Sequence, residues 1–254
     1  MFDHATARAL TARELGQLID IASGLDEAGW ALPTRCPGWS VRDLCSHAGL
    51  AAGQQAEAFR RANKGIVELP EYPGAPSLGP AETLELLRDG SREIDAAIGD
   101  LNADALAGMT PLPFALLPTA IALQIPVFEY AFHRDDLATA VGEDSTLAPD
   151  VAPELIEFFV GLAGMLASRA EPGVPTHTYR LVAPIASTTF APTSDGWAVT
   201  NDDAPVTEHC TISGSNDVIA LFAMGRIGAD DPRLDVTGPA AAHAGDFKRW
   251  FPGP

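Results

Sequence analysis

The sequence predicts a helical domain followed by a small α+β domain. Segments with helical periodicity fill the chain to about residue 170, the stretch EPGVPT then occupies residues 171–176, and short alternating segments follow it. At 254 residues the chain exceeds the usual size of one domain, about 100–200 residues. We therefore place one domain at residues 1–170 and a second at residues 171–254.

Five helices are predicted in the first domain. The first is expected to begin at Thr11, where T-A-R-E offers a capping box with Glu14. The second has the best-defined start, because Ser40 is a good N-cap and Asp43 lies at the favourable first-turn position. The remaining helices are predicted at 80–98, 114–140 and 153–170.

One long loop interrupts the helical pattern. Residues 62–80 are rich in proline and glycine and have no helical period. Loops of this length are usually functional or disordered, so this segment could be a lid over a site. The sequence leaves that question open.

The second domain is predicted to mix strands and helices. HTYRLVAP, STTFAPT, GWAVT, VTEHCTIS and RLDVTG resemble strands. NDVIALFAMGRI predicts a helix capped by Ser213 or Ser215, and AAAHAGDFKRWF predicts a terminal helix.

Charge and composition exclude several classes of partner. The net charge of −18 arises from 34 acidic and 16 basic residues, and such a surface repels phosphate backbones and anionic lipid headgroups. We therefore expect neither nucleic acid nor a membrane as a partner. The start MFDHATARAL lacks the pattern of a secretory signal, and no segment approaches 18 consecutive apolar residues. A cytoplasmic protein, monomeric or a small homo-oligomer, is the expectation.

The cysteines do not predict a disulfide framework. Cys36, Cys45 and Cys210 are odd in number and widely spaced, without a C-x-x-C pair. Cys45 and His47 cannot share a metal on a helix, because residues two apart lie about 200° apart around the axis. Buried structural thiols are the expected state.

Three residues form a candidate metal site. Glu129 and His133 are four residues apart, so on a helix their side chains project from one face. His47 shares a face with Leu44 and Ala51, and all three candidate ligands are expected to point inward. Two histidines and a carboxylate with one open position suit catalytic zinc, and also non-haem iron or nickel. The alternative is that all three are hydrogen-bonded polar residues of the core.

The segments CPGWSVRDLCSHAGL and FEYAFHRDDLA resemble the mycothiol-dependent maleylpyruvate isomerase family, whose first domain is a DinB-like metal-binding bundle. DVIALFAMGRI and LDVTGP resemble the small α+β module of the same family. The resemblance implies a four-helix bundle that binds Zn²⁺ through His47, Glu129 and His133, with mycothiol as cosubstrate. It also implies that Arg226 of the second domain contributes to the active site.

Three further side chains have open assignments. Arg226 could hold a substrate carboxylate bidentately, or it could be a helix-end arginine bound to the last carbonyls. Arg134 is expected to pair with a surface acid such as Asp135 or Asp136. Asp136 could instead orient a histidine ligand by accepting a hydrogen bond from the imidazole.

These observations favour a metal-dependent enzyme that uses a low-molecular-weight thiol, mycothiol, on a small electrophile that could carry a carboxylate. In an isomerase the thiolate adds to a conjugated cis double bond, permits rotation and leaves; in an S-transferase the adduct is retained. The alternatives are a non-catalytic module that binds metal or ligand, and a metal-assisted hydrolase with water in place of the thiol.

Overall fold

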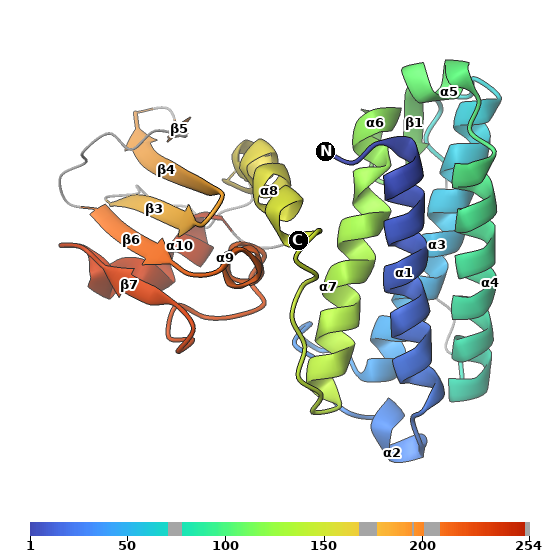
Figure 1. Cartoon of the computed structure of the whole chain (residues 1–254), viewed down its shortest axis with the longest axis horizontal. Coiled ribbons are helices and arrows are strands. Elements are labelled where there is room, and N and C mark those ends of the chain that lie inside the picture. Colours follow the sequence, from blue (N-terminus) through green and yellow to red (C-terminus); the bar gives the residue numbers. More distant parts are fainter. Residues whose placement is uncertain (71–77, 168–176, 195, 201–208, 252–254) are drawn as a thin grey trace. The chain divides into compact units, whose positions relative to one another are not determined.

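The computed structural model (Figure 1) describes residues 1–70, 78–167, 177–194, 196–200 and 209–251. Within these limits the chain forms two compact units, Met1–Thr146 and Leu147–Pro254. The expected boundary after residue 170 is therefore too late, because helix α8 (Ala152–Ala167) contacts α9 (Asn216–Ala223) of the second unit. The EPGVPT segment and part of the 62–80 loop lie outside the described residues.

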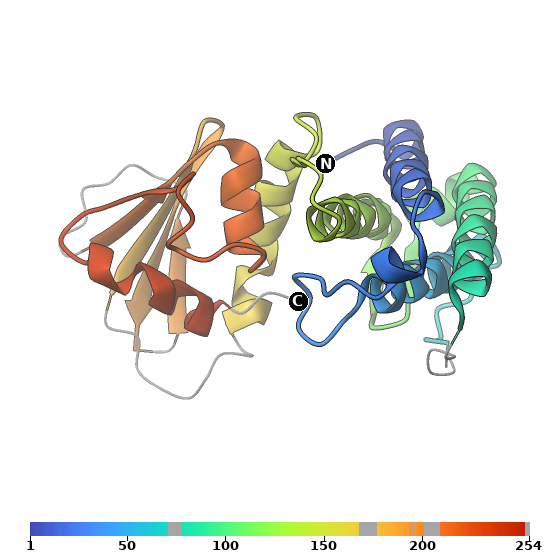
Figure 2. The same ribbon diagram turned by 90° about the horizontal axis from the view of Figure 1, so that it is seen from below.

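The first unit is a four-helix bundle, as predicted. Its long helices are α1 (His4–Ser23), α3 (Val41–Asn63), α4 (Pro80–Gly99) and α7 (Gln124–Ala140). Contacts join α3 to α4, α4 to α1, α1 to α7 and α7 to α3, which closes the bundle. Figure 2 shows these helices nearly end-on. The short helices α2 (Glu27–Trp30), α5 (Ala103–Ala107) and α6 (Thr119–Ala122) complete the unit.

Helix α1 begins earlier than the sequence predicts. Asp3 is its N-cap and accepts a hydrogen bond from the Thr6 amide, so Thr11 lies well inside the helix. The Thr11 hydroxyl donates to Ala7 O, and Glu14 does not reach back to it. The residues before Thr11 are helical, and Asp3 caps the helix at their start. The T-A-R-E pattern therefore lies inside the helix and does not mark its beginning.

The predicted start of α3 is confirmed. Ser40 caps the helix and forms the full capping box with Asp43. Further along, α3 approaches α4 closely where Gly49 faces Gly90. A Cβ at Gly90 would lie 2.7 Å from Gly49 O, so glycine is required here for packing.

The helix predicted over 114–140 is wrong in its first part. Residues Met109–Leu112 (β1) and Ala115–Pro118 (β2) form an antiparallel hairpin instead. Three prolines at 111, 113 and 118 remove amide donors and favour extended conformations in the residues before them, which explains the hairpin. Pro126 is tolerated in α7 because the first turn of a helix needs no amide donors.

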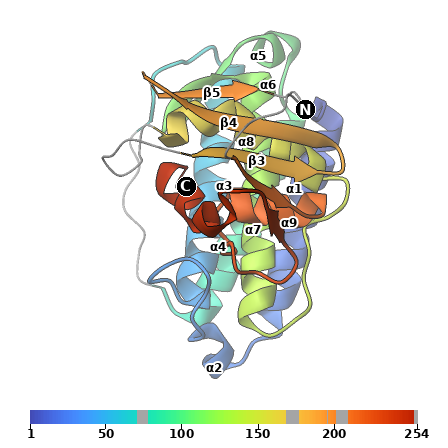
Figure 3. The ribbon, with the colours of Figure 1, turned by 90° about the vertical axis from the view of Figure 1, so that its left-hand side faces the viewer.

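The second unit contains the five strands predicted. They are β3 (Thr178–Ala183), β4 (Ala186–Thr193), β5 (Gly196–Thr200), β6 (His209–Ser213) and β7 (Asp235–Thr237). The sheet order is β5-β4-β3-β6-β7 (Figure 1), and only the β3–β6 pair is parallel among the described strands. Figure 3 shows β5, β4 and β3 next to one another in this order. The terminal helical segment splits into the 3₁₀ turn η1 (Ala241–Asp246) and α10 (Phe247–Trp250).

An aromatic cluster forms the core of this unit. Phe247 lies at its centre, with its ring centroid 4.9 to 6.3 Å from those of five other aromatic residues. These five are Phe159, Tyr179, Phe190, Phe222 and Phe251. These side chains form a largely apolar layer between the sheet and its helices, to which the strands contribute their inward-facing residues. Among the described helices of the whole chain, none has the length and apolar character needed to cross a bilayer.

Candidate metal centre

The structure brings the three predicted ligands together. His47 comes from α3, and Glu129 and His133 come from adjacent turns of α7. Their ligand atoms all lie within 4.8 Å of one another. Nε2 of His47 is 2.8 Å from Glu129 Oε1, and Nε2 of His133 is 3.8 Å from the same oxygen. The cluster therefore needs both helices, because α3 adds a third candidate ligand to the i, i+4 pair of α7.

The spacing of these atoms fits a tetrahedral ion. Ligands about 2.0–2.1 Å from a zinc ion lie about 3.3–3.5 Å from one another. The two measured separations, 2.8 and 3.8 Å, fall on either side of this value. Nitrogen and carboxylate donors also match the ligand set that zinc and similar divalent ions accept. The residues therefore fit a divalent metal with small side-chain rotations.

The site lies at the edge of the bundle, not in its interior. The His133 side chain is 8% exposed, but those of Glu129 and His47 are 24% and 40% exposed. The expectation that all three point inward is thus correct only for His133. The periodic stripe of a helix shows which residues share a face, but not how much of that face its neighbours cover. At this edge Glu129 and His47 are accessible from solvent.

Trp39 covers one side of the cluster. Its ring centroid lies 4.8 Å from that of His47 and 6.2 Å from that of His133. The turn that presents it runs through Cys36, Pro37 and Gly38; the Trp39 amide donates to Cys36 O, and Gly38 has φ +80°. Proline followed by a glycine with positive φ is typical of a type II turn. The Pro37–Gly38 pair signals this turn in the sequence, but the sequence predictions assign Trp39 no role at the cluster.

The acidic and basic residues after His133 pair differently from the prediction. Arg134 is buried and binds Glu14, with Nε 2.7 Å from Oε2, instead of a surface acid. Asp135 and Asp136 are also buried, and both form ion pairs with Arg35. Arg134 projects about 100° around the helix from His133 and so points toward α1. The sequence pattern does not show that α1 lies on this side of α7.

All three cysteines are free thiols and buried, as predicted. Burial raises the pKa of Cys45 to about 12 and that of Cys210 to about 11. A buried thiol of this kind is a poor nucleophile at neutral pH. Cys36 differs from the other two, because its thiol lies 3.4 Å from Asp136 Oδ2.

Arg226 lies just beyond the end of α9 in the second unit. Its amide donates to Leu221 O, and Nη1 lies 3.4 Å from Met224 O. Both contacts are those of a helix-end arginine. Lys248 also donates to the end of α9, at Ala223 O, and its burial together with the nearby Arg226 lowers its pKa to about 7. Two basic side chains therefore meet at this helix terminus.

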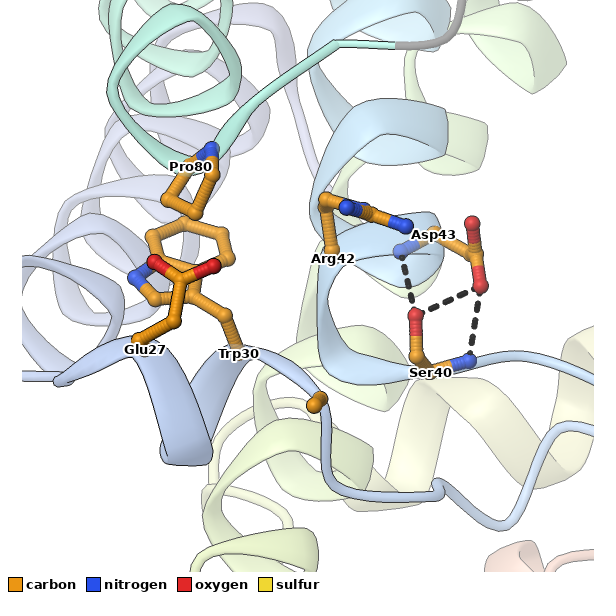
Figure 4. Close-up of a pocket in the computed structure, with 7 residues that line it drawn as sticks. Glu27, Trp30, Ser40, Arg42, Asp43 and Pro80 are labelled. Carbon is orange, nitrogen blue, oxygen red and sulfur yellow. Dashed lines mark hydrogen bonds between the residues drawn. The ribbon is translucent and has the colours of Figure 1, made fainter.

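A separate pocket of about 340 Å³ lies near the start of α3 (Figure 4). Its walls include Trp30, Arg42 and Pro80, and on one side the Ser40 and Asp43 capping pair. The hydrogen bonds drawn there are those of the helix cap. None of the three candidate ligands lines this pocket.

Comparisons with known proteins agree with the fold and the motifs. The family model of the mycothiol maleylpyruvate isomerase N-terminal domain matches residues 11–138. Among solved structures, the chain is similar to the mycothiol-dependent maleylpyruvate isomerase and to a histidine-to-alanine mutant of it, with TM-scores of 0.70 and 0.71. Each is 17% identical to this chain, and each match covers 93% of both chains. No match was found among curated proteins.

The matched segment runs from α1 through most of α7 and includes all three candidate ligands as well as the turn that carries Trp39. It spans half of the chain. The chain therefore belongs to the family defined by the mycothiol maleylpyruvate isomerase N-terminal domain.

Proposed function

We propose that this protein is a metal-dependent enzyme that uses mycothiol as cosubstrate and acts as an isomerase or S-transferase on a small electrophile carrying a carboxylate. The observation that carries the proposal is the convergence of His47, Glu129 and His133 within 4.8 Å at an accessible edge of the bundle. Membership of the family supports the thiol and the isomerase chemistry. The net charge of −18 disfavours nucleic acid or anionic membrane as the substrate.

The three side chains would hold the ion, with Nε2 of each histidine and one oxygen of Glu129 as ligands. Zn²⁺ is the ion that this donor set with one open position suits best. When bound, it would supply a Lewis acid that deprotonates a thiol at neutral pH. No fourth protein ligand belongs to this cluster among the described residues, which leaves room for the thiol.

The remaining residues have supporting roles. Trp39 shields one side of His47 and His133 from water and so strengthens electrostatic interactions at the site. Cys45 and Cys210 take no part, because burial keeps both thiols protonated. Arg226 is proposed to bind the substrate carboxylate through its planar guanidinium.

The first test is metal content. We expect purified wild-type protein to carry close to one divalent ion per chain, measured by elemental analysis without an affinity-tag metal. His47→Ala, Glu129→Ala and His133→Ala should each remove it. His243→Ala, which changes an exposed histidine of the second unit, is the matched control and should retain the metal. A metal-free wild type that binds no added zinc would refute the proposal.

The second test distinguishes the reaction classes by counting thiols. The metal-loaded protein is incubated with mycothiol and maleylpyruvate, and free thiol and product are followed together. An isomerase forms product without net consumption of thiol, whereas an S-transferase consumes one thiol for each product molecule. Product formed equally well without mycothiol would identify a metal-assisted hydrolase or another thiol-independent reaction.

A further inference from the structure

A buried polar network lies directly behind His133, on the side away from the other ligands. Oδ2 of Asp136 is 3.4 Å from His133 Nδ1 and also accepts a hydrogen bond from the Cys36 thiol at 3.4 Å. Oδ1 of Asp136 is 3.1 Å from the Arg35 guanidinium. Asp136 is fully buried, and Arg35 and Cys36 both come from the loop before α3.

The protonation of a metal-bound histidine explains this arrangement. A histidine that binds metal through Nε2 carries its proton on Nδ1, and that proton needs an acceptor. His133 Nδ1 is buried and has no hydrogen bond within the described part of the chain. The Asp136 carboxylate is the group in position to accept it after a small rotation, which binding of a metal would favour.

We propose that Asp136, held in place by Arg35 and Cys36, is the positioning residue for His133, so that the loop before α3 controls the metal affinity of a site to which it gives no ligand. This inference rests on the metal site of the proposed function. Positioning residues of this kind typically change metal affinity by about 10- to 100-fold.

Cys36, His133 and Asp136 could in principle form a ligand set of their own, since their ligand atoms also lie within 4.8 Å of one another. Arg35 argues against it. Its guanidinium is already 3.1 Å from Asp136 Oδ1, and a dication beside it would meet strong repulsion with little water to screen it. The network therefore orients His133 and does not itself bind the metal.

The test measures zinc affinity by competition with a chromophoric chelator, together with the visible spectrum of the cobalt-substituted protein. Asp136→Asn should weaken zinc binding by about 10- to 100-fold. Arg35→Lys keeps the charge but loses the planar fork, so it should show a smaller loss. Cys36→Ser keeps a donor to Asp136 and should retain affinity, whereas Cys36→Val should lower it.

Glu14→Gln is the matched control. It breaks another buried ion pair of α7, that of Arg134 with Glu14, and tests whether loss of stability alone weakens the metal site. Equal affinities for Asp136→Asn and Glu14→Gln would overturn the inference but leave the proposed function intact. A thiolate-to-cobalt charge-transfer band that disappears in Cys36→Ser would also overturn it, because Cys36 would then be a ligand. A wild type that binds no metal would refute the proposed function and the inference together.

Discussion

The interiors of the two units differ in the residue types that fill them. The bundle packs small residues closely, as at Gly49 and Gly90, and buries the charged groups of Glu14, Arg134 and Asp136 on or against α7. The core of the second unit is a cluster of aromatic rings around Phe247. Buried charges cost stability unless they are paired, and each of these three is paired: Arg134 with Glu14, and Asp136 with Arg35 of the loop before α3. The aromatic core serves packing.

The largest effect should come from the aromatic core. Phe247→Ala removes a fully buried ring that contacts five others and should lower the free energy of unfolding by about 3–5 kcal/mol. Chemical denaturation measures the loss, and metal content at low temperature should not change. A loss below about 1 kcal/mol would show that the cluster packs loosely.

The close approach of α3 and α4 offers a test of the bundle. Gly90→Ala places a methyl group 2.7 Å from Gly49 O and should destabilise the chain by about 1–3 kcal/mol, although alanine favours helix. Gly16→Ala, at a helical position with open space around it, is the control and should be neutral or stabilising. Equal effects at both positions would mean that the helices can separate at no cost.

Lys248 predicts a pH dependence specific to the second unit. Burial and Arg226 lower its folded pKa to about 7 from 10.5, so between these values the unfolded chain binds more protons than the folded chain. Stability should therefore rise with pH over this range, by at most about 1.4 kcal/mol per pH unit. Below pH 7 Lys248 is protonated in both the folded and the unfolded chain, so the free-energy cost of burying its charge no longer changes with pH. Lys248→Met should flatten the rise between pH 7 and 9 in denaturation curves; identical slopes would contradict the assignment.

The smallest effect should come from the cap of α3. Ser40→Ala removes the acceptor of the Asp43 amide and should cost about 1 kcal/mol. The Ser40 hydroxyl and amide also lower the pKa of Asp43, so the difference between wild type and Ser40→Ala should shrink as acid protonates this carboxylate. Denaturation at pH 7 and at pH 3 checks this. An unchanged difference would show that Asp43 contributes nothing to the cap.

Local signals in the sequence predicted most of the elements. The Ser40 cap, the start of α4 at Pro80 and the alternation in β3 to β6 depend on neighbours within a few residues, and the structure confirms them. The fold class and the family were also predicted correctly. Errors arose where competing local patterns coexisted, as with the early cap at Asp3 and the prolines before α6.

The sequence predicted that the three candidate ligands lie together, but it did not predict their surroundings. The i, i+4 spacing places Glu129 and His133 together, whereas their distance to His47 depends on how α3 meets α7. The buried pairs Arg134–Glu14 and Arg35–Asp136 join residues about a hundred positions apart. A single sequence contains no signal for such contacts, so Arg134 was expected to pair with a surface acid and no partner was predicted for Arg35.

The pairing of one arginine with two consecutive buried carboxylates also constrains how the chain folds. Asp135 and Asp136 lie on the same helix, and leaving either carboxylate buried without its cation would cost several kcal/mol. The two carboxylates of α7 can therefore be buried at low cost only when the loop that carries Arg35 packs against the helix. The loop and the helix are separated by a hundred residues in the sequence. We therefore expect the ligand geometry at His133 to form only when this non-local contact forms, and hydrogen exchange of the α7 amides during refolding would test this expectation.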